Sequence, residues 1–493
     1  MRLVPSAAWS ALYTAAGIVA LAGVLLSPST PTVVLFGSVM VTAFALLCSR
    51  SPLVAGVTWV VLSPALYPFV RYPRSGSLLT FDRMYLSALV LALLMRRSGR
   101  RPSAPSVRAF AVAVVVFAAL FLIRAVTTHP HVVSAVETFI DAVLLPCAAF
   151  FICRRTADTP RKLRMWAAGL MVSGTLVAVL GVTERYFGYE LASLSGGAVR
   201  VDSEAGGLVR VSGPYSVPEV YALTLALTLA ATLFWWMSGR THGTRSRVLP
   251  SVVGPVLATV QLAGLIVSLF RVAWACAPVI LVIGLGLRVG HRLRLAAVGL
   301  AVALAVLVLF VPLQDNAVFR TRMGNTDNVA GRLATYQVGV EIWRSAPLTG
   351  VGINRFVDAQ SRVQAREVWG VRSVKSPHSS FIASLAEQGA AGFTALIAVC
   401  AFCARMLRRL GRLAPRDPTH QVLRAAVMAG VLSYLAFSLE LTMLPYGPSN
   451  IALAVLLGLS AAAIENAGPL GAERRTRTAA GRAAGTPLAK PAS

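Results

Sequence analysis

The segment RAFAVAVVVFAALFLIRAV (108–126) decides the fold class of this chain. Between Arg108 and Arg124 it holds only apolar residues, enough at about 1.5 Å per residue to cross most of a bilayer core. Similar segments recur along all 493 residues, of which 56% are hydrophobic and 13% charged, with a mean hydropathy of +0.70. This composition excludes a soluble enzyme with a membrane tail and predicts an all-α, polytopic membrane protein.

Apolar windows ended by charges or by Pro and Gly predict about fourteen transmembrane helices. They lie near residues 7–26, 32–48, 52–70, 82–96, 108–126, 133–153, 163–184, 217–237, 250–269, 272–288, 295–313, 380–404, 421–441 and 449–465. We expect one membrane domain over 1–465, followed by a disordered basic tail over 466–493.

The basic residues predict the orientation of these spans. With a cytoplasmic N-terminus, 29 Lys and Arg fall on the inner side and 17 on the outer side. The inner groups are short and dense, which is the positive-inside pattern, so both termini are expected in the cytoplasm. Much of the net charge of +27 therefore reflects topology, and nucleic acid is not needed as a partner. The six cysteines show no metal-ligand spacing and are interpreted as core residues.

One predicted outer loop is too long to be a simple connection. Residues 314–379 join the eleventh and twelfth spans and carry nine basic and five acidic residues. Loops of this length are usually functional or disordered. Within it, GRLATYQVGVEIWRSA (331–346) has apolar residues at helical spacing, at Leu333, Tyr336, Val340 and Trp343. This spacing predicts a helix at the membrane surface.

Four side chains on the predicted outer side could carry chemistry. Arg332 opens the loop helix, His378 precedes the twelfth span, Arg210 precedes the eighth, and Arg271 lies between the ninth and tenth. An arginine fork binds phosphate and diphosphate and stays charged. A histidine can take a proton near neutral pH. Together they would suit a lipid diphosphate and an incoming hydroxyl.

The segments GRLATYQVGVEIWRSAPLTGVGINRF (331–356) and SPHSSFIASLAEQGAAGF (376–393) resemble the O-antigen ligase/polymerase superfamily of envelope glycosyltransferases. The family pattern has an Arg-led helix with Trp, then P-x-x-G-x-G, then H-[NS]-x-[FY]-[IL]-x-x-L-x-E-x-G. RVSGPYSVPEVYA (210–222) is similar to its R-x-x-G-x-x-x-x-P segment, and SLFRVAW (268–274) to its S-R-G-A turn. In the latter the Ser is displaced and Val replaces Gly. The motif region is thus about 205–390.

The resemblance implies a reaction and roles for these residues. A glycan on a polyprenyl diphosphate, undecaprenyl diphosphate for instance, is transferred with inversion, and without metal or other cofactor, to a hydroxyl outside the plasma membrane. His378 would be the catalytic base, and Arg210, Arg332 and Arg271 would bind the diphosphate. Glu387, in the same motif, is expected to be a hydrogen-bonding partner inside the bundle. Expected partners are the donor, a glycan, lipid or protein acceptor, and membrane lipids.

Simpler interpretations exist for several of these residues. An arginine at a membrane boundary is often only an interfacial anchor, most plausibly for Arg271. Glu137 and Asp141 share a helix face and could form a proton relay, but a position near the outer interface is favoured.

Two rival functions stay open from the sequence. One is a transporter or flippase of lipid-linked oligosaccharides, although no repeated halves are visible. The other is a noncatalytic scaffold, suggested by the departures at 214–219 and 268–273. Ligase or polymerase activity, the sugar, the acceptor, the prenyl length and the oligomeric state are not readable from the sequence.

Overall fold

The computed structural model describes residues 47–48, 50–70, 81–95, 103–188, 201–202, 208–215, 217–239, 248–285, 327–363 and 376–467. These residues are helical apart from short turns and one antiparallel strand pair, β1 (Val201–Asp202) with β2 (Leu208–Val209). Two predicted spans, 7–26 and 295–313, lie outside the described residues, as do all but the last residues of 32–48 and the tail from 468.

The other predicted spans all correspond to helices. They are α3 (Pro52–Val70), α4 (Phe81–Met95), α5 (Pro105–Val126), α6–η1–α7 (Val132–Thr156, with a π-helical turn at Ile140–Leu144), α8 (Pro160–Phe187), α9 (Pro218–Gly239), α10 (Val248–Val267), α11 (Arg271–Leu285), α16 (Ser380–Leu413), α17 (Pro418–Glu440) and α18 (Gly447–Asn466). Seven of these are long and apolar enough to cross a membrane, and four are shorter apolar helices. An all-helical, multi-pass membrane protein is therefore confirmed, while the count of fourteen stays a prediction.

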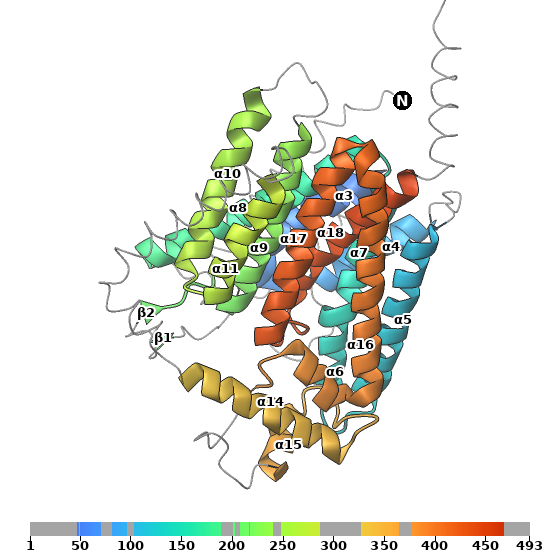
Figure 1. Ribbon diagram of the computed structural model, residues 1–493, viewed down its shortest axis with the longest axis vertical. Helices are drawn as coiled ribbons and strands as arrows, with labels where there is room; N and C mark the ends of the chain where they lie inside the picture. Colours follow the sequence, from blue (N-terminus) through green and yellow to red (C-terminus); the bar gives the residue numbers. More distant parts are fainter. Residues whose placement is uncertain are drawn as a thin grey trace, which may run out of the picture.

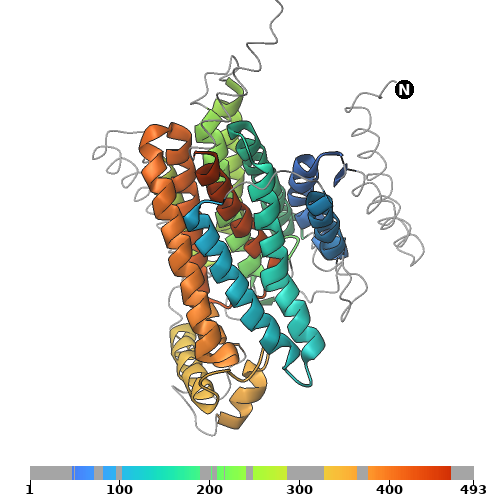
Figure 2. The same ribbon diagram turned by 90° about the vertical axis from the view of Figure 1, so that its right-hand side faces the viewer.

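The bundle is centred on α9 and α18, which are buried along most of their length (Figures 1 and 2). At the rim of the bundle, apolar side chains are exposed. On α5, Val112, Val115 and Ile123 are more than half exposed, as is Leu94 of α4. Such a surface would be unfavourable in water, but it matches the hydrocarbon of a bilayer. The rim therefore faces lipid.

Small residues and one buried amide hold the helices together. A Cβ on Gly458 of α18 would lie 2.9 Å from the Cβ of Cys153 on α7, so only glycine allows these helices to approach so closely. Fully buried Gln261 of α10 donates to the carbonyl of Met171 (3.0 Å) and to Thr175 (3.2 Å) on α8, and it bonds Thr232 of α9. Side-chain hydrogen bonds of this kind join helices where no water is present.

Two helices lie across one end of the bundle, which we call the α14 end. They are α14 (Asp327–Ser345) and α15 (Phe356–Val363), and both views place them beneath the membrane helices (Figures 1 and 2). At the α14 end, α9, α11, α16 and α18 begin and α17 ends (Figure 1). Polar residues at these helix ends are thereby gathered in one region.

The predicted loop helix is present as α14, and the side chains that it buries in the protein alternate with the apolar residues that predicted it. Ala334, Val338 and Ile342 are fully buried, whereas Leu333 is 44% exposed. The buried stripe packs on Phe356 of α15 and on Ala386 of α16. Because α14 is clamped between two helices, its smaller side chains face inward and the bulky Leu333 stays outside.

A cavity of about 640 Å³ lies between α5, α7, α16, α17 and α18, with mostly apolar walls. Tyr434 and Ser438 of α17 contribute to these walls. Glu440 lies two residues after Ser438 and so points to a different side of α17. The cavity also reaches Ser380 and Phe381, the first residues of α16.

Candidate active site

Arg332 of α14 forms an ion pair with Glu440, the last residue of α17. Four residues along α14, the hydroxyl of Tyr336 donates to the carbonyl of Leu439, 2.6 Å away, and so fixes α14 against the end of α17. Burial raises the pKa of Tyr336, the Arg332 charge lowers it, and the Glu440 charge raises it. One cation, one carboxylate and one phenol thus form a compact group.

His378 lies beside this group, half-buried in the turn before α16. Burial lowers the pKa of His378 below its usual value, and the positive charge of Arg332 lowers it further. The imidazole is therefore neutral at physiological pH and can accept a proton. The structure brings together His378 and Arg332, two residues singled out from the sequence.

The backbone around His378 is held in an unusual conformation. Its φ is +44°, in the left-handed region that side-chain-bearing residues rarely occupy. Next to it, Ser379 caps α16 by accepting from the amide of Phe381 (3.3 Å), and its hydroxyl donates to the carbonyl of Ser438 (3.2 Å). The amide of Ser380 donates to the carbonyl of Leu441 (3.1 Å). The end of α17 therefore fixes the turn that carries His378.

Arg210 lies in the segment before α9 and faces Glu219 in the first turn of that helix, with 3.7 Å between Nη1 and Oε1. The segment is anchored on α8 by Glu184, whose carboxylate accepts from the amides of Ser212 (3.1 Å) and Gly213 (2.5 Å). A fixed backbone thus presents Arg210 at the α14 end.

Arg271 is the first residue of α11, after a tight turn in which Leu269 has a φ of +53°. Phe270 packs on Phe437 of α17 with ring centroids 5.1 Å apart, and Cys276 of α11 lies within electrostatic reach of Glu440. The Nη2 atom of Arg271 is buried and has no hydrogen-bond partner among the described residues. Arg271 is thus carried to the α14 end on a helix packed along α17.

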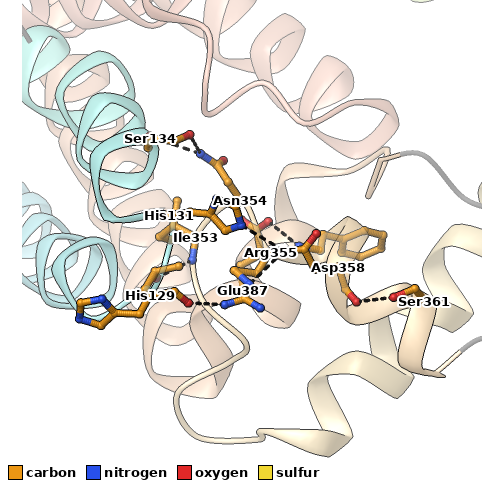
Figure 3. A network of polar contacts seen from close by, with 11 residues as sticks. His129, His131, Ser134, Ile353, Asn354, Arg355, Asp358, Ser361 and Glu387 are labelled. Carbon is orange, nitrogen blue, oxygen red and sulfur yellow. Dashed lines mark hydrogen bonds and ion pairs between the residues drawn. The ribbon is translucent and has the colours of Figure 1, made fainter. Parts of the chain in front are cut away.

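Glu387 holds the start of α15 rather than facing His378. Its carboxylate accepts hydrogen bonds from the consecutive amides of Asn354, Arg355 and Phe356, the last at 3.3 Å. Figure 3 shows this arrangement, with Glu387 next to the backbone of the loop. A carboxylate at a helix N-terminus is favourable because the free amides and the helix dipole both attract it.

The helix α16 is interrupted just after Glu387, where Gly389 has a φ of +68° and a ψ of −168°. The loop 347–352 fills the interruption. The amides of Val351 and Gly352 donate to the carbonyls of Ala386 (3.0 Å) and Glu387 (2.9 Å), and the amide of Ala390 donates to the carbonyl of Pro347 (2.8 Å). Backbone groups that the broken helix leaves unpaired are therefore bonded by the loop.

The same loop is attached to the turn between α5 and α6 (Figure 3). Asn354 Nδ2 donates to Thr138 Oγ1 (2.8 Å), Arg355 donates to the carbonyl of His129, and His131 pairs with Asp358 (3.4 Å). Arg355 also pairs with Asp358 (3.2 Å). His129 and His131 therefore take part in contacts that position the loop.

Asp141 lies in the π-helical turn and pairs with Arg83 of α4, with Oδ1 at 3.0 Å from Nη2 and 3.3 Å from Nε. The sequence analysis did not identify Arg83 as its partner. Glu440 and Glu219 were also missed, although a carboxylate at the end of an apolar span is rare enough to have been a signal. Among the described residues, no three His, Cys, Asp or Glu side chains are grouped closely enough to hold a metal ion.

Comparison with known proteins agrees with the motifs. A family model described as O-antigen ligase matches residues 256–397, which include Arg271, Arg332, His378 and Glu387 but not Arg210. No curated protein matches the chain. The match covers less than a third of the chain, and within those residues it supports the resemblance to the O-antigen ligase/polymerase superfamily.

Proposed function

We propose that this protein is a glycosyltransferase that moves a glycan from a polyprenyl diphosphate to an acceptor hydroxyl. The observation that carries the proposal is that the turn with His378 and the guanidinium of Arg332 are both attached to the end of α17, at the carbonyl of Leu441 and at Glu440. The family match supports it, since the matched model describes ligases. We further propose that residues 1–465 act as one membrane domain, with both termini cytoplasmic and the α14 end outside the plasma membrane.

The chemistry follows from these positions. The neutral imidazole of His378 takes the proton of the acceptor hydroxyl as its oxygen forms a bond to the anomeric carbon. The bond between that carbon and the diphosphate oxygen breaks on the opposite face, which inverts the configuration. The electron pair leaves with the diphosphate, whose growing negative charge Arg332 stabilises, together with Arg210 and Arg271. No metal is needed for this route.

The test is glycan transfer by purified protein in nanodiscs, with chelator present and polyprenyl-diphosphate oligosaccharides extracted from the native host as donor. His378→Ala should lower the rate by about 10²–10⁴-fold because the base is lost. Arg332→Ala should lower it by about 10²–10³-fold because leaving-group stabilisation is lost.

A matched control comes from the same end of the molecule. Arg344 is exposed in the last turn of α14, so R344A should retain most of the transfer. Donor movement between leaflets without transfer would instead make this a flippase. If the protein neither transfers the glycan nor moves the donor between leaflets, that result would favour a noncatalytic scaffold.

A further inference from the structure

Two of the arginines proposed to bind the diphosphate already face an internal carboxylate. Arg332 pairs with Glu440, and Arg210 lies 3.7 Å from Glu219. The two glutamates are buried to the same degree, with side chains 14% and 13% exposed. In both, Oε2 is buried and has no hydrogen-bond partner among the described residues. The same arrangement thus occurs twice in one site.

Glu440 in particular is poorly suited to a purely stabilising role. Glu440 is the last residue of α17, where the helix dipole is negative and repels an anion. A buried carboxylate oxygen without a hydrogen bond costs free energy. The 3.7 Å separation of Arg210 and Glu219 is too long for a hydrogen bond. Each glutamate is itself only partly satisfied, because its Oε2 has no hydrogen-bond partner among the described residues.

We propose that Glu440 and Glu219 are internal counter-anions, which hold Arg332 and Arg210 until a diphosphate displaces them. This inference rests on the proposed function, because it takes the two arginines as the diphosphate ligands. A diphosphate offers each guanidinium several charged oxygens, whereas each glutamate pairs with its arginine through one, Oε1. Binding therefore exchanges one anion for another, so the arginines are not left buried without a partner.

The exchange also lowers the affinity of the site for the polyprenyl diphosphate that remains after transfer. A competing internal anion lowers the apparent affinity by the fraction of time that the arginine is occupied. After transfer, the carboxylates return to the arginines and help to expel the polyprenyl diphosphate. The glutamates act as positioning residues for the arginines, and they keep the product from blocking the site.

The test is binding of inorganic pyrophosphate to the full-length protein in nanodiscs, measured by isothermal titration calorimetry. If Arg332 is paired about nine-tenths of the time, Glu440→Gln should bind pyrophosphate about tenfold more tightly than wild type. In transfer assays the same variant should show a lower KM for donor and stronger inhibition by polyprenyl diphosphate. A structural role predicts the reverse, weaker binding, because Arg332 would lose its support.

A double-mutant cycle separates displacement from a general charge effect. In an Arg332→Gln background, Glu440→Gln should give no gain in affinity, since there is no guanidinium to release. A gain that persists there would overturn the proposal. Glu465→Gln is the matched control: it removes one negative charge from the Arg154–Glu465 pair at the opposite end of the bundle, and it should leave pyrophosphate affinity unchanged.

The second pair provides an independent arm. Glu219→Gln, measured alone and together with Arg210→Gln, repeats the double-mutant cycle for the pair at the start of α9. If E440Q does not fold, these variants still test the proposal. Binding that is unchanged or weaker in the folded glutamate variants would refute the inference, even if transfer itself is observed. Tighter binding without any transfer would uphold the inference on the arginines and reject the proposed reaction.

Discussion

Arg332 acts on two neighbours at once. Its charge pairs with Glu440 and also lowers the pKa of His378, so a cation that is suited to an anionic leaving group keeps the imidazole unprotonated. The left-handed backbone of His378 fits this setting, because strained residues persist where the surrounding structure holds them and function requires it. Base and cation are therefore electrostatically coupled.

The coupling predicts a pH effect at His378. The imidazole reacts with diethyl pyrocarbonate only when neutral, and a lowered pKa keeps it neutral to a more acidic pH than the usual value of about 6.5. Arg332→Gln removes one cause of the lowering, so the midpoint of His378 modification should move to higher pH while burial keeps it below 6.5. Mass spectrometry of the labelled peptide measures the midpoint.

Arg344→Gln, on the same helix but exposed, should leave that midpoint unchanged. A midpoint that R332Q fails to move would show that burial alone lowers the pKa of His378.

At the residue scale, the sequence was informative where a side chain is marked by its neighbours along the chain. His378 and Arg332 are found through local motifs, and the structure places them together. Glu440 and Glu219 have no such motif. The Glu440–Arg332 pair joins residues in α17 and α14, and only tertiary packing brings them together.

At the scale of elements, the interruption of α16 is the feature on which the site depends. A Cβ on Gly389 would lie 2.6 Å from the amide nitrogen of Gly350, and the φ of +68° disfavours any side chain. Gly389→Ala should therefore destabilise the protein by about 1–3 kcal/mol and lower the midpoint of thermal unfolding in detergent. The rate of glycan transfer should also fall, because α16 carries both the interruption that the loop 347–352 fills and the turn that holds His378.

Gly331→Ala is the matched control for this substitution. Gly331 lies in α14 with nothing within 4 Å of an added Cβ, so alanine should be neutral or stabilise by about 0.5–1 kcal/mol. Equal unfolding midpoints for G389A and wild type would contradict the role given to the interruption.

The sequence contains Gly350, Gly352 and Gly389 in its motifs, but it does not show that one segment fills the gap in the other. Hydrogen bonds between Pro347 and Ala390 join backbone groups, which leave no side-chain pattern. The side of α14 that is buried is set by packing as well. Ala334 and Val338 contact α15 and α16, whereas the sequence pattern shows only that apolar residues recur at helical spacing.

At the scale of the whole molecule, apolar length predicted the class of protein because a bilayer imposes its thickness on every span. The number of spans is less well determined, since α4 and α11 are short and charge lies near their ends. The orientation of the protein in the membrane is predicted from the arginines at the end of the bundle opposite α14, such as Arg405, Arg408 and Arg409.

This asymmetry predicts which end faces outward. A single cysteine at Leu348, whose side chain is 73% exposed at the α14 end, should react with a membrane-impermeant thiol reagent on intact cells. A cysteine at Arg409, near the far end of α16, should react only after the membrane is opened. The opposite labelling pattern would reverse the proposed orientation.

The interlocked loop and helix also bear on how the protein is made. With the α14 end outside, as we propose, residues 347–352 leave the ribosome before α16 and have to cross the membrane before that helix enters it. Until the two meet, four backbone groups around Gly389 would face hydrocarbon unbonded, at a cost of several kcal/mol each. The twelfth predicted span cannot reach its final depth before the exported loop has folded. Export, insertion and construction of the site are therefore a single ordered process.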